Sequence, residues 1–261
     1  MDEKYIIESV RKSLKVLKLF SDGDCQYKLS DLHEMSGISK SSLIRILTTL
    51  ESEGFVISDE TTKKYRLGLY FNSIASSMGY SALKNQLEPD LKWASEKSGM
   101  LVHFTVLKDL QLYMLSRVYP EDNTPVSIAF ASNEGGEVPL NATGAGKIVA
   151  TYSDIETTTE LIRNCKFKKY SSTTITNSFD FYKSIEETRK LGYALNEGEH
   201  EPFLACLSRP IFYANGKLVG ALSLSGFKEM LSGENFEKIN EISKETVKRI
   251  SRRLGYEKKD C

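Results

Sequence analysis

Residues 39–50 read SKSSLIRILTTL, and this stretch decides the fold of the N-terminal part of the chain. In a helix, Leu43, Ile46, Leu47 and Leu50 fall at positions i, i+3, i+4 and i+7 and therefore share one apolar face. The rest of the surface carries hydroxyl and cationic side chains, and the stretch contains no acidic residue. Such a helix suits the DNA major groove, where side chains near its N-terminus approach the base edges.

Two helices are expected before this stretch. Apolar residues at three- and four-residue steps predict a first helix over residues 7–20. A second, short helix begins near Ser30, and Gly37 supplies the tight turn of a helix-turn-helix.

A hairpin is expected after the stretch. Residues 55–57 and 64–67 flank a polar segment, with Phe55 and Ile57 predicted to share the inward face. Three helices followed by a cationic hairpin predict a winged helix-turn-helix. This order of elements favours DNA binding over the alternative, an ordinary amphipathic helix with a solvated outer face.

The expected DNA contacts come from the helix and from the wing. Arg45 is the best candidate for reading a guanine, because its fork can bond O6 and N7 together. Hydroxyls and the other cations are expected to hold phosphates. The predicted set is Ser39, Lys40, Ser41, Ser42, Arg45, Thr48, Thr49, Lys63, Lys64 and Arg66.

Composition limits the classes of protein that remain. The 261 residues carry 35 basic and 35 acidic side chains, so overall charge gives no support for nucleic-acid binding. The start lacks a signal peptide, and no apolar run approaches the roughly 18 residues that span a bilayer, so we expect a cytoplasmic protein with no membrane partner. The four cysteines have no paired spacing, and we expect no metal site, no disulfide framework and no cofactor.

A linker helix and a second domain are predicted to follow. The expected ranges are 1–68 for the winged helix-turn-helix, 69–82 for the linker helix and 83–257 for an α+β domain. Pro89 predicts a helix break or a fresh helix start.

The second domain is expected to hold an antiparallel sheet. Strands are predicted at 102–106, 112–118, 204–212 and 217–225, with a turn at Asn215-Gly216 between the last two. A closing helix over about 233–254 completes the α+β pattern.

Two facts place a small polar pocket in this domain. Thr143 can cap a helix that begins at Gly144, and the open N–H groups of a helix start favour a carboxylate. Strand alternation puts Leu204, Cys206 and Ser208 on one face, and Ser223 and Ser225 on one face of the next strand. The alternative is ordinary packing of small residues between sheet and helix.

The chain resembles the IclR family of bacterial transcriptional regulators over nearly its whole length. In the N-terminal part the matching motifs are GISKSS (37–42), RILTTL (45–50), GFV (54–56) and YRLG (65–68). In the C-terminal part they are PLNATGAGK (139–147), LGYA (191–194), Glu199, Cys206, Pro210, GKL (216–218) and ALSLSG (221–226). Each motif is weak alone, whereas their order and spacing together are specific.

The resemblance implies an N-terminal winged helix, a linker helix and a GAF-like α/β effector-binding domain. It also implies dimers or tetramers that bind a palindromic operator in double-stranded DNA, with a small metabolite adjusting repression or activation. The effector-contacting positions of the family match Gly144, Ala145, Asn196, Leu204, Cys206, Ser223 and Ser225, with Phe130 and Val138 as apolar walls.

Four positions depart from the family pattern. Ser39 stands where proline is frequent, and serine starts a helix equally well. Asn196 stands where aspartate is frequent, Phe203 replaces a usual glycine and Gly198 replaces a usual acid. The last three changes bear on which ligand binds.

An enzyme is the competing hypothesis. Cys206 would be the nucleophile, with His200 nearby and the N-terminal unit serving protein interaction. We expect no catalysis, because no helix N-terminus or elbow is predicted to place the thiol. His103 is expected to be a surface or packing residue.

Overall fold

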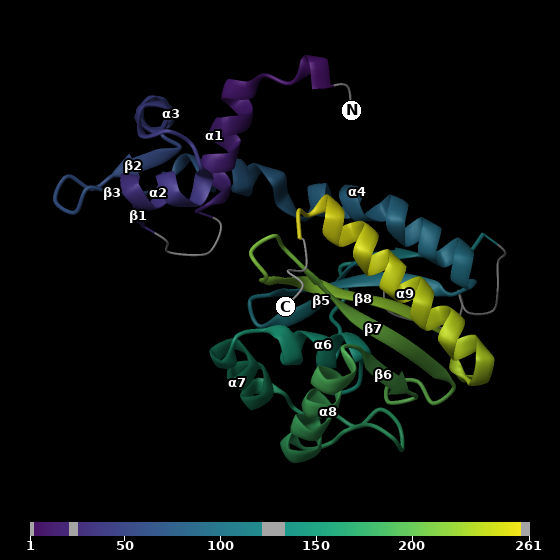
Figure 1. Cartoon of the computed structure of the whole chain (residues 1–261). Coiled ribbons are helices and arrows are strands. Elements are labelled where there is room, and N and C mark those ends of the chain that lie inside the picture. The colour runs from purple at the N-terminus through teal and green to yellow at the C-terminus, as the bar shows by residue number, and fades with distance from the viewer. Residues whose placement is uncertain (1–2, 21–25, 122–133, 257–261) are drawn as a thin grey trace. The chain divides into compact units, whose positions relative to one another are not determined.

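The computed structural model describes residues 3–20, 26–121 and 134–256 (Figure 1). The chain divides after Gly79 into an N-terminal unit and a C-terminal unit, which are described separately below. The N-terminal unit contains η1 (Glu3–Tyr5), α1 (Glu8–Lys18), β1 (Tyr27–Lys28), α2 (Leu29–Ser36), α3 (Lys40–Ser52), β2 (Val56–Ser58), β3 (Lys64–Leu67) and the first part of α4 (Tyr70–Ser98). The C-terminal unit contains the rest of α4, β4 (Leu101–Lys108), β5 (Gln111–Val118), α6 (Gly144–Tyr152), α7 (Ile155–Asn164), α8 (Ser178–Leu191), β6 (Ala194–Glu197), β7 (Leu204–Phe212), β8 (Leu218–Phe227), η2 (Lys228–Leu231) and α9 (Gly233–Arg253).

The N-terminal unit is a winged helix-turn-helix. Gly37 ends α2 in the left-handed conformation (φ 68°), which glycine adopts without a steric penalty, and Ser39 caps α3. Leu43 and Leu47 of α3 are fully buried in a core that also contains Leu32. The predicted apolar face of α3 therefore packs as expected.

The wing differs from the prediction in its inward residue. Val56 pairs with Leu67 and is buried, while Phe55 packs edge-on against the rings of Tyr70 and Phe71. The expectation that Phe55 and Ile57 share the inward face was wrong, because Val56 between them takes the inward side and successive side chains of a strand point to opposite faces. The short strand β1 adds a third strand in the order β1-β3-β2, which the sequence did not indicate.

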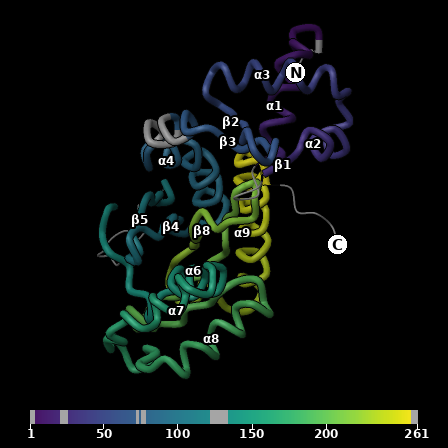
Figure 2. The backbone as a smooth tube through the Cα atoms, turned by 90° about the vertical axis from the view of Figure 1, so that its left-hand side faces the viewer, coloured from purple at the N-terminus to yellow at the C-terminus, as the bar shows by residue number. Residues whose placement is uncertain are grey.

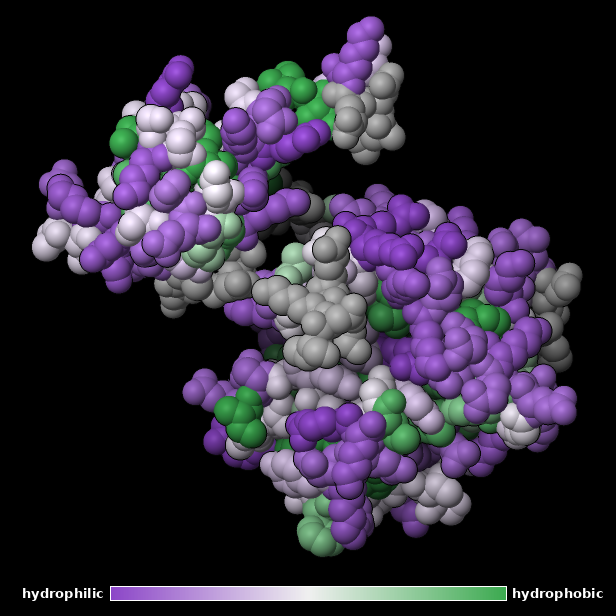
Figure 3. Space-filling view, in the orientation of Figure 1, coloured by the Kyte–Doolittle hydropathy of each residue, from purple (hydrophilic) through white to green (hydrophobic). Residues whose placement is uncertain are grey.

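Helix α1 buries only the C-terminal part of the apolar stripe that its spacing suggests. Val16 is fully buried, whereas the side chains of Ile7, Val10 and Leu14 are at least half exposed. Figure 3 shows an apolar patch over the start of this helix. An apolar groove of about 680 Å³ lies between α1 and α3.

Helix α4 is interrupted at Gly79 and not at Pro89. Gly79 has φ 51° and ψ 175°, a combination that almost only glycine adopts. Pro89 lies inside the helical segment that follows, so the predicted break there was wrong. The domain boundaries expected from the sequence, with a linker helix over residues 69–82, remain a prediction.

The C-terminal unit is a five-stranded antiparallel sheet covered by helices on both faces (Figures 1 and 2). The strand order is β5-β4-β8-β7-β6, and β6 is a strand that the sequence did not indicate. The second part of α4 and α9 pack on one face in a large apolar core. Helices α6, α7 and α8 cover the other face around a second core.

A buried carboxylate ties α4 to α9. Asp90 is fully buried and accepts a hydrogen bond from the Nε of Arg249 and from the Nε of Arg253, each at 2.8 Å. The Arg249 guanidinium also lies over the Trp93 ring, 4.6 Å from its centre. No helix in the described ranges is long and apolar enough to cross a membrane.

Candidate functional site

The outer face of α3 presents most of the predicted DNA contacts to solvent. Lys40, Ser41, Arg45, Thr48 and Thr49 are exposed, and Ser42 is half-buried. The Ser39 hydroxyl accepts the N–H of Ser42 at 3.4 Å and lies within 3.3 Å of the Ser41 and Ser42 hydroxyls.

Two details change what individual side chains on this face can do. The Thr49 hydroxyl donates to the Arg45 carbonyl oxygen at 2.8 Å, so it is engaged within the helix. Ile44, which the predicted set omitted, is 49% exposed on the same face as Lys40 and Thr48. Ile44 lies four residues from Lys40 and four from Thr48, and this helical spacing could have shown that it shares their exposed face.

The wing carries its three cations at the end of an ordered turn and along β3. The Asp59 carboxylate accepts the N–H groups of Thr61 and Thr62, and the Thr62 bond is the main reason why its pKa is lowered. Lys63 and Arg66 are exposed and Lys64 is half-buried.

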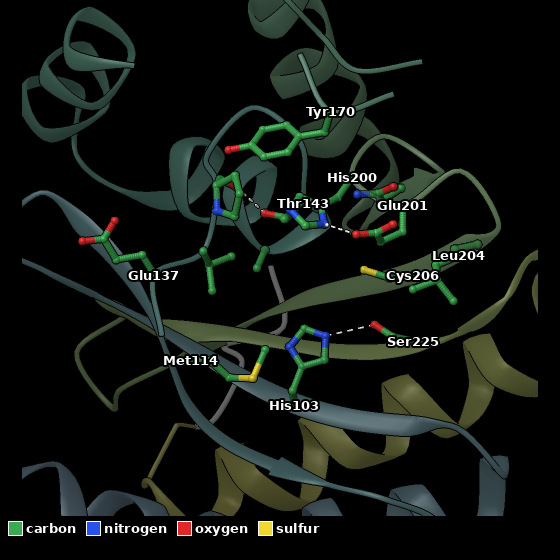
Figure 4. A pocket seen from close by; sticks show the side chains of 15 residues that line it. His103, Met114, Glu137, Thr143, Tyr170, His200, Glu201, Leu204, Cys206 and Ser225 are labelled. Atoms are coloured by element: carbon green, nitrogen blue, oxygen red, sulfur yellow. Dashed lines mark hydrogen bonds and ion pairs between the residues drawn. The ribbon is translucent and has the colours of Figure 1, made fainter. Parts of the chain in front are cut away.

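A cavity of about 460 Å³ lies between the sheet and the start of α6 (Figure 4). The predicted effector contacts that line it are Val138, Ala145, Asn196, Leu204, Cys206 and Ser225. Gly144 and Ser223 do not line the cavity, and Phe130 lies outside the described residues.

Gly144 allows close packing, which is a different role from the one predicted. A Cβ there would lie 2.5 Å from the Ser208 Oγ and 3.0 Å from the Cys206 Sγ, so only glycine lets α6 approach the sheet. Ser208 and Ser223 share a hydrogen bond of 2.7 Å beneath this contact and are both fully buried. Gly144 and Ser223 therefore pack next to the cavity, where they hold the start of α6 close to the sheet.

The start of α6 offers fewer free N–H groups than its sequence suggests. The Thr143 Oγ1 accepts the Gly146 N–H at 3.0 Å, which confirms the predicted cap. The Gly144 N–H is close enough to the Cys206 thiol to lower its pKa slightly. Among the described residues, the Ala145 N–H is left to face the cavity without a protein partner.

His103 lies on the floor of the cavity, and its assignment as a surface or packing residue was incomplete. It is buried, its Nε2 lies 2.9 Å from the Ser225 Oγ, and desolvation lowers its pKa from 6.5 to about 4. It pairs with Ser223 across β4 and β8, so it shares the polar face of the sheet. Its place as the polar member of an alternating strand is the signal that could have identified it.

Asn196 uses both ends of its amide to hold the protein itself. Its Nδ2 donates to the Ala142 carbonyl at 2.6 Å, and its Oδ1 accepts the Glu199 N–H at 2.9 Å. An aspartate could not make the first bond, which explains the asparagine in physical terms. Directly behind it, Lys147 of α6 forms a buried ion pair with Glu199 (Nζ–Oε1 2.5 Å).

The opposite side of the cavity carries aromatic and acidic groups. His200 lies 4.6 Å from Tyr170, ring centre to ring centre, and its Nδ1 is 3.6 Å from a carboxylate oxygen of Glu201 (Figure 4). Burial lowers the pKa of His200. Glu137 lies at the edge, and no lysine or arginine of the described chain lines this cavity. A bound anion would therefore rely on neutral donors.

Cys206 is placed against a helix start, contrary to prediction, yet the site does not activate it. Burial raises the pKa of its thiol, and this outweighs the lowering by the Ser208 hydroxyl and the Gly144 N–H. Nucleophilic chemistry requires the thiolate, which this environment disfavours.

Comparison with known proteins identifies both units. Residues 9–60 match the IclR helix-turn-helix domain, and residues 76–252 match the bacterial transcriptional regulator IclR C-terminal domain. The chain is 25% identical over 252 residues to the HTH-type transcriptional regulator XynR of Escherichia coli (strain K12), covering 96% of this chain and 98% of XynR.

Solved structures agree on the fold. A crystal structure of an IclR transcriptional regulator from Silicibacter sp. TM1040 has a TM-score of 0.76 and 24% identity, covering 96% of this chain and 97% of that one. An IclR homologue from Microbacterium hydrocarbonoxydans, complexed with 4-hydroxybenzoate, has a TM-score of 0.59 and 17% identity, covering 94% and 98%.

The matched family consists of transcriptional regulators and not of enzymes, which decides against the nucleophile hypothesis. Its members join a DNA-binding helix-turn-helix domain to a domain that binds small-molecule effectors. Both domain types of the family follow each other in this chain and together match nearly its full length. The chain therefore belongs to the IclR family of bacterial transcriptional regulators.

Proposed function

We propose that this regulator binds a palindromic operator as a homodimer or homotetramer, with α3 in the major groove and the wing on the phosphate backbone. Two recognition helices would then lie about 34 Å apart, one turn of the duplex. Such a protein acts in the cytoplasm, where the bacterial chromosome lies.

The main support for this proposal is the charge of the exposed side chains on the outer face of α3. Its exposed side chains from Lys40 to Thr49 include two cations and no acid, although the chain as a whole is neutral. Lys63 and Arg66 extend from the wing in the same unit. This distribution of charge fits a duplex, whose backbone is uniformly negative.

The cavity is proposed to hold a small organic acid. Its carboxylate would accept the Ala145 N–H at the start of α6, where the helix dipole favours negative charge. The aromatic acid held by the Microbacterium homologue is consistent with this ligand class. For the acid to regulate binding, its affinity must differ between the conformations with and without operator, since equal affinity would shift neither population.

An operator-binding assay tests the DNA part. A site selected from random duplexes by the full-length protein would be titrated at several salt concentrations, because phosphate contacts make affinity fall steeply with salt. Arg45→Ala should weaken binding by roughly 1–3 kcal/mol if Arg45 reads a guanine. Arg163→Ala, at an exposed arginine of α7, is the matched control. Unchanged binding by R45A would remove Arg45 from the set of base contacts.

A thermal-shift screen of small organic acids tests the cavity. Ala145→Leu places bulk beside the helix start, and Ala214→Leu makes the same change at an exposed turn residue. An acid that stabilises the wild type and A214L but not A145L supports the site. Equal stabilisation of A145L would place the ligand elsewhere.

A further inference from the structure

Ile44 is the exposed apolar side chain on the outer face of α3. Its side chain is 49% exposed and takes no part in the core formed by Leu43 and Leu47. The other exposed side chains between Lys40 and Ser52 are polar. A single exposed isoleucine is ordinary on a protein surface, so only the position of Ile44 on the helix distinguishes it.

That position is the middle of the surface that would face the bases. Ile44 lies one helical turn from Lys40 and one from Thr48, on the same face. Ser41, three residues before it, and Thr48 have short side chains, so the isoleucine projects beyond them while lysine and arginine reach outward to phosphates. With α3 in the major groove as proposed, an aliphatic side chain at this place would approach the floor of the groove.

The chemistry of the major groove leaves one partner for such a side chain. Each base pair presents hydrogen-bond donors and acceptors there, and the C5-methyl group of thymine is the apolar exception. Packing Ile44 on a donor or acceptor would desolvate that group without a replacement bond, which is costly. Packing it on a methyl group removes apolar surface of both partners from water.

The branched side chain also suits this role. A β-branched residue in a helix has one strongly preferred χ1 rotamer, so little rotational freedom is lost on contact. We propose that Ile44 recognises the methyl group of a thymine at a fixed position of each operator half-site. The inference rests on the proposed placement of α3 in the major groove and adds a base-specific contact to it.

Thymine-to-uracil replacement in the operator isolates this contact. Deoxyuridine keeps the hydrogen-bonding edge of thymine and lacks only the methyl group. Each thymine of the selected site would be replaced in turn, and affinity for the full-length wild type and for Ile44→Ala would be measured. The matched control is Ile155→Ala, at an isoleucine of α7 that is 77% exposed.

Ile44→Ala and thymine-to-uracil replacement form a double-mutant cycle. We expect it to show an interaction between Ile44 and one thymine of each half-site. At one thymine per half-site the wild type and I155A should lose about fourfold in affinity, the value of one buried methyl group of about 0.8 kcal/mol. I44A should bind the thymine site more weakly and should not distinguish thymine from uracil there.

Three outcomes would overturn the inference. The first is that I44A stays sensitive to uracil at that position, because another residue would then read the methyl group. The second is that the wild type responds to uracil at no position, because no methyl group is then read. The third is a random pool that yields no enriched sequence. Only this last outcome also removes the proposed placement of α3, so the two failures are distinguishable.

Discussion

Replacing His103 with glutamine tests how a buried neutral imidazole governs the acid stability of the effector domain. Desolvation lowers the pKa of His103 from 6.5 to about 4 in the folded state. Between these values the unfolded chain binds a proton that the folded chain excludes, so stability is lost as the pH falls. With these two pKa values, linkage predicts a loss of about 2 kcal/mol between pH 7 and pH 5.

Urea unfolding of the full-length chain measures this loss. Trp93 is the single tryptophan of the sequence and packs against the core of the C-terminal unit, so its fluorescence reports on that unit. The free energy of unfolding would be compared at pH 7, 6 and 5 for the wild type and His103→Gln. Glutamine keeps a hydrogen-bonding group near Ser225 and does not titrate.

The effect of His103 is the difference between the two proteins in how much their free energy of unfolding changes with pH, because the other titrating groups contribute equally to both. The wild type should lose about 2 kcal/mol more than H103Q over this range. Parallel pH profiles would refute the reasoning, since they would mean that His103 is protonated as readily in the folded domain as in the unfolded chain.

The same fluorescence assay checks three further changes. Asp90→Asn should cost about 1–3 kcal/mol, because its two arginine partners lose a buried carboxylate but remain partly hydrated; an unchanged midpoint would contradict this. Thr143→Ala removes the cap of α6 and should cost about 1 kcal/mol, whereas Thr143→Ser should restore most of it. Gly144→Ala should cost roughly 1–3 kcal/mol because the new Cβ meets Ser208, and wild-type stability would show that α6 can move away freely.

The sequence predicted the elements whose pattern is local. The apolar spacing of Leu43 and Leu47, the turn at Asn215-Gly216 and the cap at Thr143 each depend on neighbours within a few residues, and the structure confirms them. The strands β1 and β6, of two and four residues, are too short to produce a recognisable alternation.

Features that depend on distant pairing were not predictable in this way. The place of His103 in the cavity follows from its pairing with Ser223, on a strand much later in the chain. The close approach of Gly144 to Ser208 also joins two separate segments. A composition of small residues is compatible with either packing or binding, and only the three-dimensional contacts place Gly144 against the sheet and Ala145 at the cavity.

The two faces of the central sheet imply an alternating tolerance to substitution along each strand. On β7, Leu207 and Ile211 belong to the apolar core under α9, whereas Cys206 lines the cavity and Ser208 lies beneath it. Changes at Leu207 or Ile211 should lower the amount of folded protein whichever effector is present, while changes at Cys206 should alter which effector is recognised. New specificities could therefore arise in this domain by substitutions two residues apart, without disturbing the side that keeps it folded.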